Sequence, residues 1–96
     1  MGERPPRRLI DPAVQKQLRA LRPRERADVV LKLLELSQVF GQPHQHAGIG
    51  IRKLHADLFE CRVGLAVRVL FRASPDALII RFIGTHDEVQ KHLLGK

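Results

Sequence analysis

The last third of the chain, Gly64–Leu94, reads GLAVRVLFRASPDALIIRFIGTHDEVQKHLL and contains the signals that decide the fold. Two runs rich in branched apolar residues, 67–73 and 77–83, predict strands that are joined by a turn. Residues 85–88 then form a Thr-x-x-Glu capping box, which predicts a helix over about 86–94. This stretch therefore predicts an antiparallel hairpin that leads directly into a short helix.

Two further strand-like runs, 49–54 and 58–63, precede this stretch, so the second half of the chain predicts a four-stranded antiparallel sheet. The first half has a helical period instead. Asp11 followed by proline predicts the start of a helix, which Pro23 ends. A second helix, over 24–40, carries apolar residues on more than half of its circumference, so we expect it to be buried on a wide face. The result is an α+β fold, in which a helical hairpin packs on the sheet.

The chain of 96 residues is expected to form a single domain, 1–96, around one core. At its start, residues 7–10 predict either a disordered segment or an extra edge strand. Lysine and arginine number 17 against 10 acidic residues, and the net charge of +7 favours nucleic acid or an acidic protein as a partner. Cys61 is the only cysteine, which excludes an internal disulfide. Without a signal peptide or a long apolar run, we expect a soluble cytoplasmic protein that does not bind a membrane.

Strand parity predicts which side chains share a face of the sheet. A three-residue loop at 64–66 brings the apolar residues on either side of it to one face, whereas a slip of one residue would mix apolar and charged residues on both faces. A four-residue loop at 73–76 then pairs Phe71 with Leu78 and places Phe82 on the same apolar face. This face is the expected seat of the two helices.

The opposite face is predicted to carry a row of three arginines on adjacent strands: Arg62, Arg68 and Arg81. Like charges that oppose each other across strands are destabilising. We therefore expect an anion to bind at this row. The alternative is an ordinary surface network, in which Glu60 beside Arg52, together with carboxylates of the last helix, neutralises the arginines.

Histidines at two places can move protons near neutral pH. His86 lies in the first turn of the last helix, where free backbone N–H groups attract phosphate. His44 and His46 lie in the loop before the first strand of the sheet, which the register brings to the same end. A His-x-His pair can chelate zinc, but no cysteine or carboxylate stands at a useful spacing, so we expect no metal and no other cofactor. Arginines that bind phosphate, together with histidines that transfer protons, are the minimum set of groups needed to cleave RNA.

The ordered elements resemble the RelE/ParE superfamily of bacterial type II toxins over roughly residues 12–94. The resemblance rests on the helical hairpin followed by IRKL at 51–54, LFECRV at 58–63, VRVLFR at 67–72 and the closing GTHDEV at 84–89. Members of the RelE and YafQ branches are ribosome-dependent mRNA endonucleases. The resemblance therefore implies a RelE-like fold and a toxin that inhibits translation by cleaving mRNA.

The resemblance also implies roles for individual residues. The Gly-Thr-His ending of these branches matches residues 84–86, which implies that His86 is catalytic. Arg68 matches the strand arginine of the RelE branch that contacts the scissile phosphate. His46 is similar to an upstream loop histidine of the YafQ branch.

The chain departs from both branches at several positions. Arg62 stands where the YafQ branch has a histidine, and the aspartate of that branch's central hairpin is missing from residues 64–66. The lysine-rich strand of the RelE branch is represented only by Arg52 and Lys53. The assignment of base, acid and phosphate ligand is therefore left open between the two branches.

Taken together, these observations predict a metal-independent endoribonuclease, in which a base activates a ribose 2′-hydroxyl for attack on the adjacent phosphorus. His86 is the expected acid and His46 the expected base, or the reverse. Arg68, with Arg62 and Arg81, is expected to stabilise the phosphoryl charge. Further contacts with the nucleic acid are expected from Arg52, Lys53, Arg81 and His44.

The expected partners are mRNA, the ribosome and an acidic antitoxin that the resemblance implies. Operator DNA is expected to be bound only through the toxin–antitoxin complex. Two alternatives from other classes stay open: a ParE-like toxin that inhibits gyrase without cutting RNA, and a non-catalytic RNA- or ribosome-binding module. The scarcity of aromatic residues, four phenylalanines with no tryptophan or tyrosine, argues against base stacking as the main mode of recognition.

Overall fold

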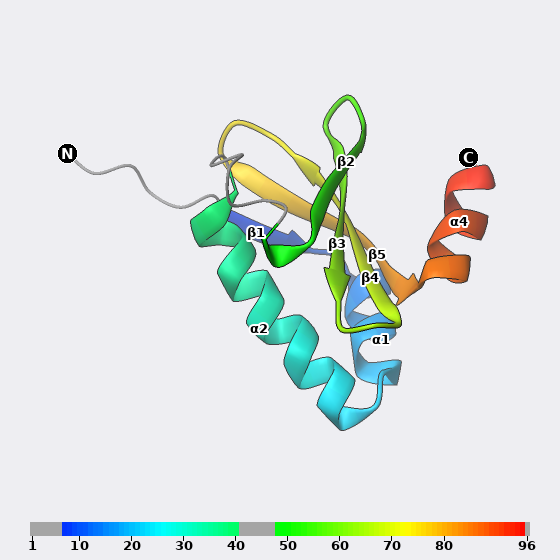
Figure 1. The fold of residues 1–96 in the computed structure, drawn as a ribbon. Coiled ribbons are helices and arrows are strands. Elements are labelled where there is room, and N and C mark those ends of the chain that lie inside the picture. Colours follow the sequence, from blue (N-terminus) through cyan, green and yellow to red (C-terminus); the bar gives the residue numbers. More distant parts are fainter. Residues whose placement is uncertain (1–6, 41–47, 96) are drawn as a thin grey trace.

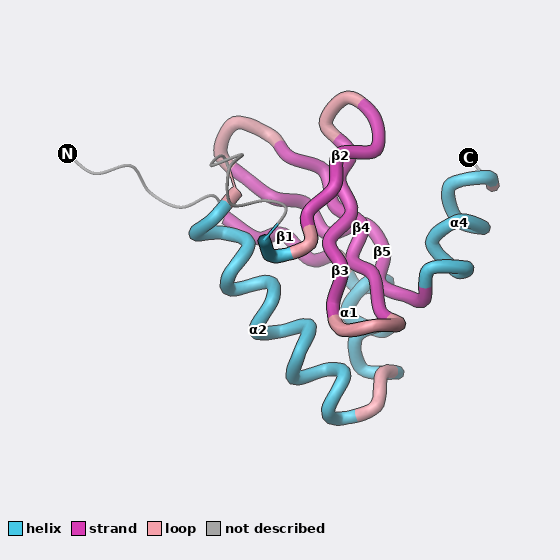
Figure 2. The backbone as a smooth tube through the Cα atoms, viewed as in Figure 1, coloured by secondary structure: helices cyan, strands magenta, loops and turns pink. Residues whose placement is uncertain are grey.

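The computed structural model of the chain describes residues 7–40 and 48–95, which form an α+β structure (Figures 1 and 2). In chain order the elements are β1 (Arg7–Ile10), α1 (Pro12–Ala20), α2 (Pro23–Val39), β2 (Ile51–His55), β3 (Leu58–Val63), β4 (Val67–Ala73), β5 (Ala77–Thr85) and α4 (His86–Leu94). The strands form one sheet in the order β1-β5-β4-β3-β2. The predicted fold class is confirmed, and of the two alternatives for residues 7–10 the structure contains the edge strand.

The N-terminal strand changes the sheet from four antiparallel strands to five mixed ones. β1 pairs with β5 in parallel, while the other neighbours are antiparallel. A parallel neighbour is possible because α1 and α2 and the three following strands separate β1 from β5 along the chain. Asp11 joins β1 to α1 and caps the helix, since its Oδ1 accepts a hydrogen bond of 3.0 Å from the backbone N–H of Val14.

The main core lies between α1, α2 and one face of the sheet. Its buried residues are Val14, Val29, Leu33, Leu36, Ile51, Cys61, Val63, Val67, Val69, Phe71, Leu78, Ile80 and Ile83. Phe71 stacks on Phe59, with ring centroids 5.6 Å apart, and Phe40 meets both rings edge-on. These aromatic contacts join the end of α2 to the β3–β4 hairpin.

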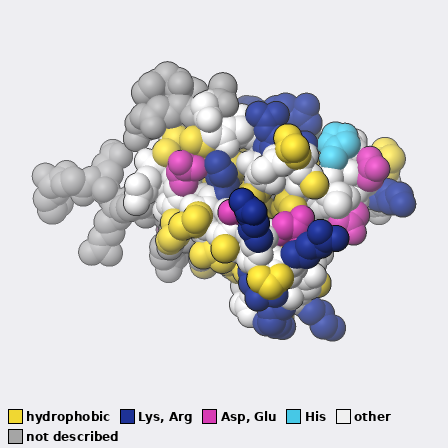
Figure 3. Space-filling model, turned by 60° about the horizontal axis from the view of Figure 1, so that its bottom comes forward, with side chains coloured by type: hydrophobic (Ala, Val, Ile, Leu, Met, Phe, Trp, Pro, Cys, Tyr) yellow, Lys and Arg dark blue, Asp and Glu magenta, His cyan; other side chains and the backbone are white. Residues whose placement is uncertain are grey.

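The expected wide buried face of α2 is wrong. Only one side of the helix packs on the sheet, so Val30 and Leu34 are exposed and Leu31 keeps 64% of its surface in solvent. Figure 3 shows hydrophobic side chains exposed over this helix. The spacing of apolar residues shows which sides of a helix are apolar, but it does not show whether another element covers them. Among the described residues, no second layer of structure lies over the outer side of α2.

The register between β3 and β4 follows the three-residue loop as predicted. Val63 pairs with Val67, Cys61 with Val69, and Phe59 with Phe71. Gly64 opens the loop with a φ of +64°, a conformation that glycine adopts without strain. This hairpin positions the site described below.

The predicted register between β4 and β5 is wrong in two ways. Phe71 pairs with Ile80 instead of Leu78, a shift of two residues that leaves the apolar side chains on the same face. Parity alone cannot detect such a shift, because both partners are apolar and point the same way. A bulge beyond Phe71 then adds one residue to β5, so that Phe82 pairs with Leu70 and Ile83 enters the core.

The bulge turns Phe82 to the face opposite the main core, which corrects its predicted position. There its ring stacks on His92 of α4, with centroids 4.4 Å apart. Leu70 and Val89 are fully buried on this side. The last helix therefore covers part of the outer face of the sheet, while α1 and α2 cover the inner face (Figure 1). None of the described helices is long and apolar enough to cross a membrane.

Candidate active site

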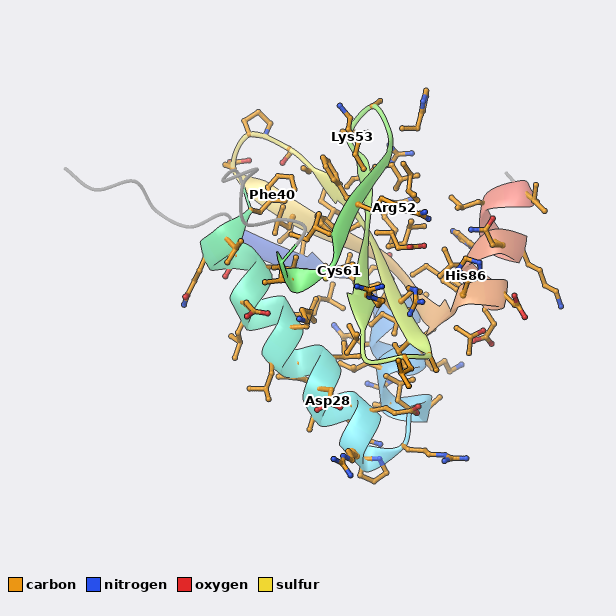
Figure 4. All side chains as sticks on the ribbon, in the orientation of Figure 1. Asp28, Phe40, Arg52, Lys53, Cys61 and His86 are labelled. Carbon is orange, nitrogen blue, oxygen red and sulfur yellow. The ribbon has the colours of Figure 1, made fainter. Side chains whose placement is uncertain are left out.

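A pocket of about 370 Å³ opens on the outer face of the sheet, where β2, β3 and β4 meet the start of α4. Figure 4 shows Arg52 and His86 on this side of the sheet. The lining residues are Gly50, Ile51, Arg52, Glu60, Arg62, Arg68 and His86. Residues from four separate segments thus come together at one place.

Two arginines stand directly opposite each other in this pocket, as the hairpin register predicted. Arg62 on β3 and Arg68 on β4 are paired residues of the antiparallel ladder. The Arg68 guanidinium donates hydrogen bonds to the backbone carbonyls of Val67, at 3.0 Å, and Leu65, at 3.4 Å. These contacts hold Arg68 at the hairpin end, where its side chain is only 15% exposed.

Gly50 makes room for this pair from the neighbouring edge. Its carbonyl oxygen accepts a backbone hydrogen bond from the N–H of Arg62 at 3.0 Å. A Cβ atom at Gly50 would lie 3.1 Å from the Cβ of Arg62, and its φ is +87°. A side chain at this position would therefore strain the backbone and narrow the pocket.

Glu60 lies between the arginines and is buried, with its side chain 8% exposed. Its Oε1 is 3.4 Å from Nη2 of Arg52 and 4.0 Å from Nε of Arg68. Its Oε2 is buried and has no hydrogen-bond partner among the described residues. Three guanidinium groups and one carboxylate leave the pocket with a net charge of +2 when the imidazole is neutral. The site therefore attracts an anion even after its internal ion pairs form.

His86 reaches the pocket because β5 ends beside β4. Gly84 pairs with Arg68 across the sheet, and His86 follows two residues later as the first residue of α4. The capping box is confirmed: Thr85 Oγ1 accepts from the N–H of Glu88 at 3.2 Å, and Glu88 Oε1 accepts from the N–H of Thr85 at 2.8 Å. The imidazole is exposed, so a substrate can reach it.

The structure separates other predicted site residues from this pocket. Arg81 lies at the β5 bulge and lines a second pocket, so the predicted row of three arginines is wrong. Lys53 pairs with Phe59, whose ring belongs to the inner face, and therefore points away from Arg52. His44 and His46 lie outside the described residues.

Glu60 is the residue whose importance sequence reasoning underestimated. Its pairing with Arg52 was predicted as part of a surface network, and the pairing itself is confirmed. The burial of the carboxylate was not expected. The sequence does contain one indication of this position. Phe59 and Cys61 are apolar and share the inner face of the strand, so the acidic Glu60 between them is placed on the outer face.

The chemistry that the described pocket offers is anion binding combined with proton transfer. Within residues 7–40 and 48–95, no group of three or more histidine, cysteine, aspartate or glutamate residues could hold a metal ion. Cys61 is buried in the main core, and burial raises the pKa of its thiol to about 11, so little thiolate forms at neutral pH. The polar groups that face the pocket itself are arginines, a carboxylate and an imidazole.

Comparison with solved structures relates this arrangement to a known class of fold. The chain is similar to the archaeal RelE–RelB complex from Pyrococcus horikoshii, with a TM-score of 0.70 and 20% identity over 84% of this chain and 94% of the other. It is similar to the toxin–antitoxin complex RelBE2 of Mycobacterium tuberculosis, with a TM-score of 0.60 and 23% identity over 85% and 99% of the two chains. The YoeB–YefM complex of Staphylococcus aureus gives a TM-score of 0.60 and 16% identity over 84% and 97%.

The sequence matches no family model and no curated protein. The structural neighbours, however, include RelE–RelB and YoeB–YefM complexes. The protein therefore has the RelE-type fold that the sequence motifs implied.

Proposed function

We propose that this protein is the toxin of a type II toxin–antitoxin system and cleaves mRNA as a metal-independent endoribonuclease. The observation that carries the proposal is the single pocket that Arg62, Arg68 and His86 line together. The RelE-type fold, found in solved toxin–antitoxin complexes, supports the same assignment.

The proposed reaction needs only the groups that line this pocket and a base. The base removes the proton of a ribose 2′-hydroxyl, and the 2′-oxygen attacks the adjacent phosphorus. The bond to the 5′-oxygen breaks, and His86 protonates that oxygen as it leaves. The products are a 2′,3′-cyclic phosphate and a 5′-hydroxyl. Arg62 and Arg68 stabilise the charge that develops on the phosphoryl oxygens, a contribution of about 2.7–4 kcal/mol per donor in comparable sites.

Two residues compete for the role of base. His46 is the choice from the sequence. Glu60 enters from the structure because it lines the pocket and its Oε2 has no hydrogen-bond partner within the described part of the chain. The variants His46→Ala and Glu60→Gln separate them. Loss of the acidic limb of the pH–rate profile in only one variant identifies the base, since a general base must be deprotonated to act.

The proposed partners follow from the charge and from the neighbours. An acidic antitoxin complements the net charge of +7, and solved structures of this fold contain the antitoxin RelB or YefM. The protein has few aromatic side chains on which bases could stack. We therefore propose that the ribosome presents the mRNA, and that operator DNA is bound only through the complex with the antitoxin.

The test is expression in cells with and without the genomic neighbour, followed by mapping of mRNA 5′ ends. We expect the wild type to arrest growth and to create new 5′ ends, and His86→Ala to slow cleavage by about 100- to 10,000-fold. Arg68→Ala should have an effect of similar size. Arg19→Gln, which removes an exposed charge on α1, is the matched control and should remain toxic.

Undiminished toxicity in both His86→Ala and Arg68→Ala would refute the site assignment. Intact mRNA together with accumulated cleaved DNA complexes would instead indicate a gyrase inhibitor. Binding that depends on arginine but not on His86, without growth arrest, would indicate a non-catalytic RNA- or ribosome-binding module. The soluble amount of each variant must equal that of the wild type.

A further inference from the structure

A second pocket, of about 280 Å³, lies beside the first, between the outer face of the sheet and α4. It is lined by His55, Leu58, Leu70, Arg72, Arg81, His92 and Leu93. Its walls combine apolar leucine side chains with two arginines. No step of the reaction proposed above uses it.

The two pockets follow each other along the same strands. On the outer face of β3, Leu58 lies two residues from Glu60. On β4, Leu70 likewise lies two residues from Arg68. Residues two apart on a strand are separated by about 7 Å. This step is of the order of one nucleotide in an extended single strand. A strand of RNA whose phosphate lies on Arg68 can therefore reach the second pocket with its neighbouring nucleotide.

The charges of the second pocket differ in their availability. Arg72 is paired with Asp57, whose Oδ1 accepts a hydrogen bond of 2.5 Å from Nη1. Arg81 is exposed, and no hydrogen bond or ion pair of its side chain is found among the described residues. The shifted β4–β5 register pairs Gly84, not Arg81, with Arg68, and Arg81 lines this second pocket instead. One cation is thus available for an incoming anion.

The apolar part of the pocket suits a flat ring. Leu70 is fully buried in its floor, and the neighbouring Phe82 ring is already stacked on His92. The volume lies just below the lower end of the range for small-molecule sites, about 300–1,000 Å³. A space of this volume suits a small ligand of about the size of a nucleoside.

We infer that the second pocket is a nucleotide subsite, which holds the nucleotide next to the scissile phosphate. Its base lies against Leu58, Leu70 and Leu93, and its own phosphate contacts Arg81. This inference rests on the proposed function, because it takes the ligand of the second pocket to be the same RNA strand. Charge complementarity and continuity with the first pocket favour RNA over an apolar side chain of a protein partner.

The test uses the purified full-length chain, with the leucine methyl groups observed by NMR during titration with AMP, UMP or inorganic phosphate. Either nucleotide is expected to shift the methyl signals of Leu58, Leu70 and Leu93 at millimolar concentration. Inorganic phosphate should leave these signals in place. Arg81→Gln should raise the nucleotide Kd about three- to fivefold, as expected for one exposed charge contact. Arg19→Gln, the matched control, should leave the Kd unchanged.

The inference is overturned if neither nucleotide shifts the three leucines, a result that leaves the pocket to a protein side chain. Equal nucleotide affinity in Arg81→Gln and Arg19→Gln overturns it as well. Mapping of mRNA 5′ ends distinguishes failure of the subsite inference from failure of the proposed function. Cleavage in cells without leucine shifts defeats the subsite alone. Leucine shifts without cleavage defeat the nuclease proposal and the role of this nucleotide as substrate.

Discussion

Replacing Glu60 with glutamine removes a buried negative charge from between Arg52 and Arg68 while keeping the size of the side chain. The carboxylate lies 4.0 Å from Nε of Arg68 and 3.4 Å from Nη2 of Arg52. It also offsets the repulsion between Arg68 and Arg62, which are directly opposed across the hairpin. We expect the variant to fold but to be less stable than the wild type.

The size of the effect follows from the burial of each partner. Two charges about 4 Å apart attract each other by about 4 kcal/mol at an effective dielectric constant of about 20. This figure applies to Arg68, which is only 15% exposed. Arg52 is 63% exposed, so its contribution is at most about 1 kcal/mol. Relief of the desolvation of Glu60 offsets much of this attraction. A net loss of about 1–3 kcal/mol in the free energy of unfolding is therefore expected.

Urea denaturation at neutral pH measures this loss, and added phosphate sharpens the test. Phosphate should stabilise Glu60→Gln more than the wild type, because the anion replaces the missing charge between the arginines. The matched control is Glu35→Gln, which removes a half-exposed carboxylate that pairs with Lys32 at 3.1 Å on the surface of α2. That pair should contribute no more than about 0.5 kcal/mol. A stabilising role of the Glu60 charge is refuted if Glu60→Gln loses no more stability than Glu35→Gln, or if phosphate stabilises both variants equally.

Three other predictions concern the surroundings of the site. Gly84→Ala should reduce the free energy of unfolding by about 1–3 kcal/mol in urea denaturation, because the new Cβ would lie 2.9 Å from the Glu88 carboxylate and from the Phe82 ring. In the control Gly48→Ala the new Cβ would meet nothing within 4 Å, so no comparable loss is expected. The thiol of Cys61 should resist alkylation in the native state at pH 8, because its pKa is raised from 9.0 to about 11. Because the unfolded chain loses this proton at lower pH than the folded chain does, the free energy of unfolding should fall as the pH rises from about 9 to about 11. Rapid alkylation of the native protein at pH 8 would contradict the burial of the thiol. Leu33→Ala should destabilise the protein by about 2–5 kcal/mol, because Leu33 is buried against the sheet. Leu31→Ala, on the exposed side of the same helix, should change stability by less than about 0.5 kcal/mol. Equal losses in denaturation would show that both sides of α2 are covered.

Local signals predicted the parts of the fold that depend on neighbours in the chain. The caps of α1 and α4 follow from Asp11 and from the pair Thr85 and Glu88, because a helix cap is made by residues within three positions of each other. The β3–β4 register follows from a three-residue loop, because a short connection leaves the strands few ways to pair. The opposed pair Arg62 and Arg68 could therefore be placed from the sequence.

The β4–β5 register could not be obtained in the same way. Both the predicted and the observed pairings of Phe71 bring an apolar residue to the inner face, so alternation does not distinguish them. The bulge that follows depends on α4, which buries Leu70 and stacks on Phe82 from the outer side. Only the packed helix makes it favourable for Phe82 to leave the inner face. The shift in register separately takes Arg81 away from Arg68 and into the lining of the second pocket.

The sequence by itself determined the α+β class, the helix caps, the central hairpin and the pair of arginines with His86 at one end of the sheet, because these features depend on short-range spacing. The tertiary structure alone decided that Glu60 is buried between arginines and that one side of α2 stays exposed. It also decided the β4–β5 register, which divides the basic residues between two adjacent pockets. These features depend on how much surface the helices cover on each face of the sheet, and residue order does not record that quantity.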